Sequence, residues 1–164
     1  AANNTVAFVN LLTAEEKQTY TCNEGARMKD ACFLSPNVYV VLSANKGPAI
    51  ASKEPVAVAP YDSHILVIEK ETQTLLCKYT LHDTHIDSCA LYNGLCYVTC
   101  TTSDGSGFLL RCTFDEEFKI VETTQIPCAR FPHGISIFSN LLAYTSYAES
   151  ALYIHKLSPE GDLL

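Results

Sequence analysis

Long apolar runs, tryptophan and basic residues are scarce or missing in this sequence of 164 residues. No apolar stretch approaches the roughly 20 residues that a transmembrane helix needs, so the sequence predicts no membrane span. Lys and Arg number 11 against 18 Asp and Glu, which gives a formal net charge of −7. Because nucleic-acid binding depends on basic side chains that neutralise phosphates, this balance argues against a nucleic-acid partner.

Signatures of catalysis and of export are missing as well. The sequence contains no Gly-x-Ser-x-Gly, no P-loop and no His-Glu-x-x-His, so it predicts no cofactor and favours a protein without catalytic activity. The first five residues, Ala1 to Thr5, lack the basic and apolar segments of a signal peptide. A processed or excised chain would lack them too, and the absence of an initiator Met leads us to expect processing or excision.

Cysteine, by contrast, is abundant, with eight residues and no Cys-x-x-Cys pair. An even number permits a secreted disulfide framework. Most of the cysteines, however, occupy expected strand positions that a small apolar residue would fill equally well, which favours buried, reduced thiols. The sequence therefore predicts a cytoplasmic protein, or a secreted one if the cysteines are oxidised.

Cys89, Cys96 and Cys100, together with His85, form the one metal-like cluster of the sequence. Zinc requires four tetrahedral ligands, and side chains on one flat strand face converge poorly on a single point. We therefore predict no metal site.

The dominant positive feature is a repeat of about 44 residues. Three apolar segments start 43 and then 44 residues apart: Ile65–Glu69, Phe108–Cys112 and Leu152–Lys156. The segments ahead of them also match one another: Ala31–Val41, Ser88–Val98 and Gly134–Tyr144. A fixed period of this length, composed of short β-rich runs and turn residues, predicts an all-β fold made of β-propeller blades, each a four-stranded antiparallel meander.

The second repeat shows the expected strands most clearly. Asn93-Gly94 predicts a two-residue hairpin turn, because both central residues of a type I′ turn need positive φ. This turn would place Leu91 opposite Cys96 and Cys89 opposite Val98. The four expected strands of this blade are Ile86–Leu91, Leu95–Thr101, Phe108–Phe114 and Phe118–Ile126.

The same reading divides the whole chain into blades. The divisions are a half blade at 6–22, a blade at 30–81 with an insertion at 44–62, a blade at 86–126, and a truncated blade at 133–164. Within the half blade, Thr13 followed by Glu16 would suit a helix start, but the surrounding alternation favours a turn. About three and a half blades cannot close a ring that needs four to eight. We therefore expect an incomplete ring that is completed by remaining blades of the same parent chain or by a protein partner.

One segment resembles a known group of propellers. Pro132-His133-Gly134-Ile135, followed by Leu141–Ser146, is similar to the "Pro-His-Gly-Ile" strand of lactonase-like and NHL/YncE-like seven-bladed propellers. The Trp-Asp pair of WD40 blades and the Gly-Gly pair of kelch blades are both missing. In the lactonase-like group the motif opens the innermost strand of a blade. At the corresponding places this chain has Asp83–Asp87, and then residues 27–31, which contain no His.

The resemblance implies a candidate site at the central funnel. His133 and His85 both precede an expected innermost strand, and with Arg130 and Asp87 they would bind an anionic sugar or another small polar ligand. The alternative is that such a His holds a neighbouring blade through hydrogen bonds of its ring nitrogens. We accordingly predict a non-catalytic scaffold that mediates protein–protein interaction, with a lactonase-like sugar-acid hydrolase as the alternative.

Overall fold

The computed structural model describes residues 5–9, 12–13, 16–21, 27–44 and 62–164. Within these residues the chain contains thirteen β-strands and no helix, which confirms the predicted all-β class. The predicted insertion lies outside the described residues except at its two ends. The strands are β1 (Thr5–Val9), β2 (Glu16–Thr21), β3 (Arg27–Ser35), β4 (Val38–Ala44), β5 (Ser63–Glu69), β6 (Leu75–Leu81), β7 (Thr84–Tyr92), β8 (Leu95–Thr102), β9 (Gly107–Phe114), β10 (Ile120–Cys128), β11 (Pro132–Phe138), β12 (Leu141–Ser146) and β13 (Ala151–Lys156).

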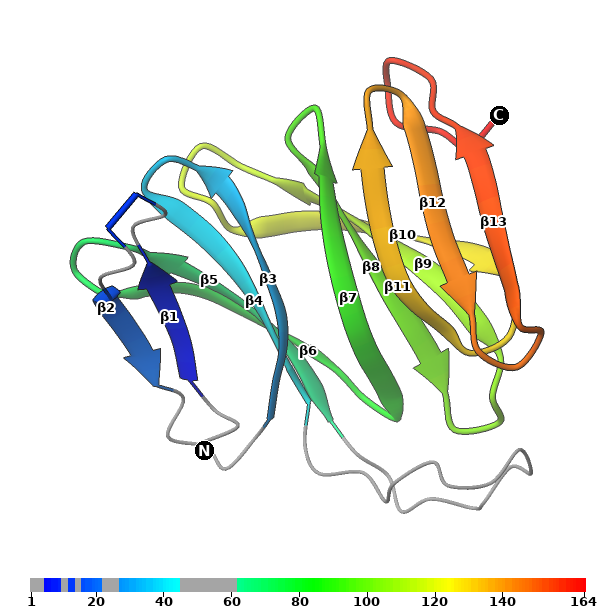
Figure 1. Ribbon diagram of the computed structural model, residues 1–164, viewed down its shortest axis with the longest axis horizontal. Coiled ribbons are helices and arrows are strands. Elements are labelled where there is room, and N and C mark those ends of the chain that lie inside the picture. Colours follow the sequence, from blue (N-terminus) through cyan, green and yellow to red (C-terminus); the bar gives the residue numbers. More distant parts are fainter. Residues whose placement is uncertain (1–4, 10–11, 14–15, 22–26, 45–61) are drawn as a thin grey trace.

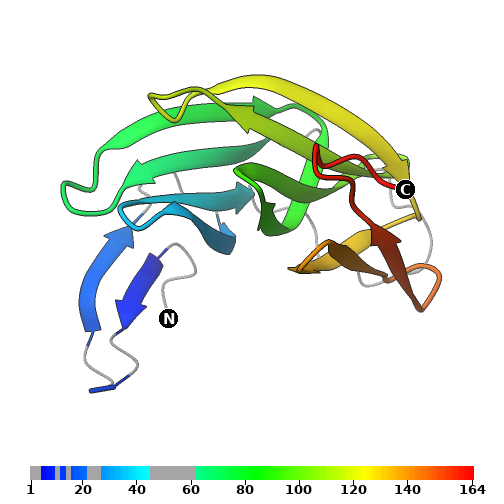
Figure 2. The same ribbon diagram turned by 90° about the horizontal axis from the view of Figure 1, so that it is seen from above.

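The strands form antiparallel sheets in which neighbours in sequence are neighbours in space. We name β3–β6 the first blade, β7–β10 the second blade and β11–β13 the third blade, while β1 and β2 pair as a separate two-stranded sheet. Figure 1 shows the sheets side by side, and Figure 2 shows that they form an open arc with β3, β7 and β11 along its concave side. The fold is that of β-propeller blades in an incomplete ring, as the repeat predicted.

The turns follow the predicted chemistry where the sequence was explicit. Asn93 and Gly94 have φ of 49° and 79°, and the strands they join pair Leu91 with Cys96 and Cys89 with Val98. These two predicted pairs are therefore confirmed. In the N-terminal part, residues 12 and 13 form a turn and β2 already begins at Glu16, so the alternative helix is wrong.

Apolar side chains fill the spaces between adjacent blades. One cluster joins the first and second blades and includes Val40, Val67, Val98 and Leu110, each at most 1% exposed. A second cluster joins the second and third blades. Its buried members are Tyr97, Leu109, Leu142, Tyr144 and Leu157. Burial between sheet faces is thus what holds the blades together as an arc.

The C-terminal residues fold back onto the second blade. Leu163 forms an isolated antiparallel bridge with Leu157. Arg111 Nη1 pairs with Asp162 Oδ1 at 2.6 Å, and the Tyr97 hydroxyl donates to the Gly161 carbonyl. The third blade therefore has three strands in one sheet, and this turn covers part of the second blade.

Three thiols meet between the first and second blades. Cys32 on β3 faces the second blade, whereas Cys89 on β7 and Cys96 on β8 face the first. Hydrogen bonds from Cys89 and Cys96 lower the pKa of the Cys32 thiol, and the same interaction together with burial raises the pKa of Cys96. Cys89, Cys96 and Cys100 are buried, as predicted, and the seven cysteines of the described residues form no disulfide.

This arrangement predicts an order of alkylation. In the native chain at pH 7, iodoacetamide should modify Cys32 first, because Cys32 is only partly buried and its thiolate is stabilised by neighbouring thiols. Cys96 and Cys100 should remain unmodified until the chain is unfolded, and should then react without added reductant. Peptide mass spectrometry measures both stages. Sulfurs that stay blocked after denaturation would show oxidation and contradict the prediction of reduced thiols.

Candidate functional site

Each of the three innermost strands carries one extra residue at the same level of the arc. The pairing of β3 with β4 shifts between Met28 and Asp30, that of β7 with β8 between Ile86 and Cys89, and that of β11 with β12 between Pro132 and Ile135. Such bulges redirect side chains that would otherwise alternate regularly. The redirected pairs of residues are Lys29–Asp30, Asp87–Ser88 and His133–Gly134.

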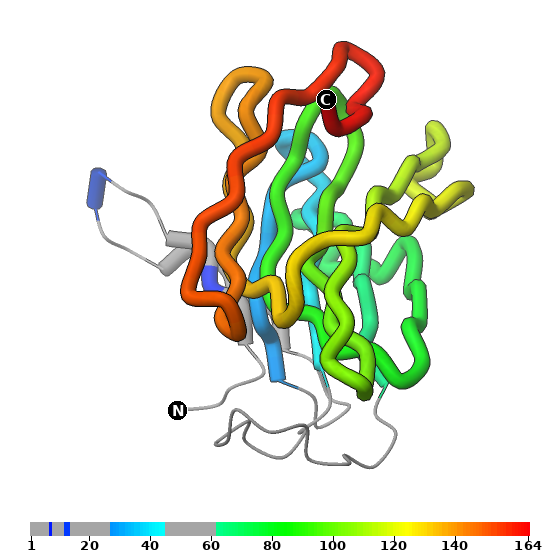
Figure 3. Tube along the Cα trace, turned by 90° about the vertical axis from the view of Figure 1, so that its right-hand side faces the viewer, coloured from blue at the N-terminus to red at the C-terminus, as the bar shows by residue number. Residues whose placement is uncertain are grey.

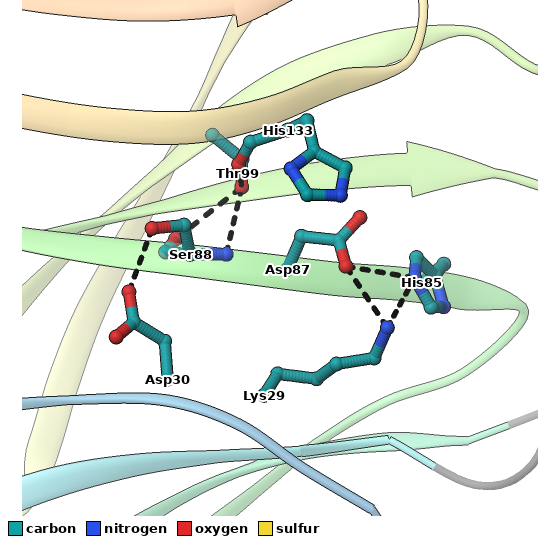
Figure 4. Close-up of polar contacts among 7 residues, drawn as sticks. All are labelled: Lys29, Asp30, His85, Asp87, Ser88, Thr99 and His133. Atoms are coloured by element: carbon teal, nitrogen blue, oxygen red, sulfur yellow. Dashed lines mark hydrogen bonds and ion pairs between the residues drawn. The ribbon is translucent and has the colours of Figure 1, made fainter. Parts of the chain in front are cut away.

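The first residue of each pair forms a row of polar side chains across the three strands. Lys29 Nζ lies 2.9 Å from Asp87 Oδ1, and Figure 4 shows the His133 ring beside Asp87. His85, two residues before Asp87 on β7, places Nε2 at 3.2 Å from the same Oδ1 and at 3.2 Å from Lys29 Nζ. The structure therefore brings His85 and Asp87 together and adds Lys29, while the His133 ring lies near Asp87 in Figure 4.

Asp87 is held as a carboxylate by this group. Burial of its side chain, which is 13% exposed, would by itself raise its pKa. The hydrogen bond and charge of His85, followed by those of Lys29, outweigh burial and lower the pKa of Asp87 to about 2. Since one hydrogen cannot serve both contacts, His85 Nε2 either donates to Asp87 or accepts from Lys29. A carboxylate engaged in this way is a poor general base, because a general base needs a pKa near the working pH and the pKa of Asp87 lies far below it.

The second residues of the first two pairs, Asp30 and Ser88, connect neighbouring blades, whereas the amide of Gly134 bonds within its own blade to Thr145 Oγ1. Asp30 Oδ2 accepts from Ser88 Oγ at 2.6 Å and from the Cys89 amide at 2.9 Å, which joins β3 to β7. Thr99 Oγ1 on β8 accepts from the Ser88 amide at 3.0 Å and lies 2.7 Å from the His133 carbonyl, to which it donates. Side-chain and carbonyl groups at the bulges thus take part in contacts between blades, while the amides of Ser88 and Gly134 bond within their own blades.

Arg130 lies apart from this group. It precedes β11, its side chain is exposed, and its guanidinium lies over the Phe131 ring at 5.8 Å from the centroid. Its amide donates to Glu149 Oε1 at 3.2 Å, and its carbonyl accepts from Ser146 Oγ at 2.6 Å. None of the contacts found for Arg130 joins it to His85, Asp87 or His133. Of the four predicted site residues, Arg130 is therefore the one that the structure leaves outside the group.

Sequence analysis missed Lys29, Asp30 and Thr99. The signal was present in the repeat, because Lys29, Asp87 and His133 hold equivalent places on their strands once the bulges are counted. When the repeats are aligned by residue number alone, without the bulges, Asp30 and not Lys29 takes the place equivalent to Asp87. Within the described residues, no three His, Cys, Asp or Glu side chains are placed to hold a metal ion.

Comparison with known proteins places the fold but not the family. No protein-family model and no curated protein matches this chain. A crystal structure of a protein of unknown function from Bacteroides caccae matches with a TM-score of 0.57 and 14% identity, over 98% of this chain and 53% of its own. This chain therefore spans about half the length of that protein. The structure of BamB from Moraxella catarrhalis matches over 94% of this chain and 67% of its own, at 8% identity and a TM-score of 0.31.

In the described residues, no helix is long and apolar enough to cross a bilayer.

Proposed function

We propose that this chain is a non-catalytic β-propeller scaffold that mediates protein–protein interaction as part of a larger chain or complex. The observation that carries the proposal is the uncovered face of the third blade. Four large apolar side chains there are exposed: Phe138 at 82%, Leu141 at 46%, Leu152 at 61% and Ile154 at 62%. Contiguous apolar surface of this kind marks an interaction site in soluble proteins.

The polar groups at the inner strands support the same proposal. An enzyme needs charged side chains that converge on an open point where substrate binds. Here Lys29, His85 and Asp87 converge on one another, and Asp30 is satisfied by donors of the next blade. These charges act within and between blades, so neither of these two carboxylates is free to attack a substrate or to remove a proton.

Hydrogen exchange tests whether the third blade lacks a strand that a larger chain or a complex would supply. In a complete four-stranded blade, a further strand would pair with β13, whereas here β13 is the outer strand of a three-stranded sheet. We expect about half of the β13 amides to exchange within seconds to minutes, while β8 and β9 in the second blade remain protected. Mass spectrometry of pepsin fragments resolves the two regions. Protection along all of β13 would contradict the proposal.

A second candidate function rests on the position of His133. Its exposed ring lies near Asp87 in Figure 4, where the lactonase-like resemblance would place a ligand for a sugar-acid hydrolase. This function is tested by incubating the chain with aldonolactones and measuring the release of acid in a pH-stat. If the hydrolysis rate exceeds that in buffer alone, and both His133→Ala and Asp87→Asn abolish the excess, the hydrolase function replaces the scaffold proposal.

The thiols bear on localisation. The seven cysteines of the described residues form no disulfide, and several are buried in the sheets; this suits a reducing compartment, and we propose a cytoplasmic location. The alkylation experiment described above is its test.

A further inference from the structure

A hydroxyl at the open end of the arc repeats a contact made between the second and third blades. Thr99 Oγ1 accepts from the amide of the bulged residue Ser88 and donates to the His133 carbonyl of the next blade. Thr145 holds the equivalent place on β12, and its Oγ1 accepts from the amide of Gly134 at 3.0 Å. Thr145 is exposed, and among the described residues its hydroxyl hydrogen has no acceptor.

The apolar surface around Thr145 repeats as well. Tyr97 pairs with Arg111 and Thr99 with Leu109, while Ala143 pairs with Ile154 and Thr145 with Leu152. The two groups of four residues therefore occupy the same places on successive blades. In the second blade this face is covered by the third blade, so that Tyr97 and Leu109 are both 0% exposed. The face of the third blade has the same construction, and no described segment of the chain lies over it, as the view from this end shows (Figure 3).

We propose that the uncovered face of the third blade binds a second copy of this chain, which packs against it as the next blade of a ring. Within that contact, Thr145 Oγ1 donates to a backbone carbonyl of the copy's sheet, as Thr99 does to His133. The inference rests on the proposed function, because it names the partner of the surface described there.

The size of the arc argues for a second copy. Each chain has four sheets, and closed propellers contain four to eight. Two arcs related by a two-fold axis along the channel would supply eight sheets, with the third blade of each copy against the β1–β2 sheet of the other.

Light scattering coupled to size exclusion, over a range of protein concentrations, tests the proposal. We expect a species of twice the 18.0 kDa chain mass. Leu152→Asp should weaken the association by about 100-fold, because it buries an unpaired charge in the contact. Val121→Asp on β10 is the matched control, since Val121 is 60% exposed and Leu152 61%. Thr145→Val should weaken association by about tenfold, because it removes the hydroxyl. Thr145→Ser keeps the hydroxyl and should associate as the wild type does.

Each result decides the matter. A dimer that Leu152→Asp dissociates and Val121→Asp leaves intact supports the proposal. A dimer that is indifferent to Leu152→Asp overturns it, because the contact then lies elsewhere. A monomer at all concentrations also overturns it. In a monomer, rapid exchange of β13 would leave the scaffold proposal standing, whereas a protected β13 would remove both.

Discussion

Replacing Asp30 with alanine should lower the free energy of unfolding by about 3 kcal/mol. The Asp30 carboxylate accepts three hydrogen bonds: from Ser88 Oγ at 2.6 Å, from the Cys89 amide at 2.9 Å and from the Ala31 amide at 2.9 Å. The substitution leaves the Cys89 amide, whose residue is 7% exposed, without its acceptor at the contact between two blades. Urea denaturation followed by circular dichroism measures the loss.

Asp104→Ala is the matched control for this experiment. Asp104 also accepts bonds from a hydroxyl and an amide, those of Thr102 and Ser106, but it lies in an exposed turn between β8 and β9. Water replaces its bonds when the carboxylate is removed, so the loss should be much smaller. Equal losses in the two variants would mean that Asp30 stabilises only its own strand and not the junction between blades.

Asp87→Asn should cost about 2 kcal/mol at pH 7, and this cost should disappear in acid. The folded chain lowers the pKa of Asp87 from 3.8 to about 2, because the favourable contacts of His85 and Lys29 outweigh burial. A lowered pKa means that the folded state favours the carboxylate. Its contribution to stability is therefore complete above about pH 5, and it is lost as the pH falls from about 4 to about 2.

The measurement is the difference in unfolding free energy between wild type and Asp87→Asn at pH 7, 4 and 2. The difference should be largest at pH 7 and approach zero at pH 2. Asp62→Asn provides the control, because Asp62 also pairs with a histidine, His82, at 2.9 Å, but the two side chains are 42% and 77% exposed. Exposed pairs contribute little. A difference for Asp87→Asn that does not change with pH would contradict the assignment of the ion pair.

The blades were predictable because their signals are local. The 44-residue period and the Asn93-Gly94 turn depend on neighbours in sequence, and they gave the sheets and the pairing of Cys89 with Val98 correctly. The candidate site was predictable only in part, since His85 and Asp87 lie near each other on one strand. Lys29 was not found, because its contact with Asp87 depends on how two blades pack.

A slip of one residue explains the largest error of interpretation. Sequence matching gave Cys32 and Cys89 the same place in the repeat, yet Cys32 faces the following blade and Cys89 the preceding one. The pairing of β3 with β4 contains a second irregularity, between Phe33 and Ser35, which the matching did not count. Because side chains alternate along a strand, one extra residue between Cys32 and the turn that follows β3 puts Cys32 and Cys89 on opposite faces when the two strands are matched from their turns.

The contacts at the bulges also determine the order in which blades assemble. The apolar faces between blades resemble one another and would tolerate exchange, but the polar contacts differ at each junction. Asp30 needs the hydroxyl of Ser88, whereas Thr99 needs only a carbonyl, here that of His133. A blade inserted after the wrong neighbour would bury the Asp30 carboxylate without its donors. Repeat proteins are prone to such misassembly during folding, and these few side chains select against it.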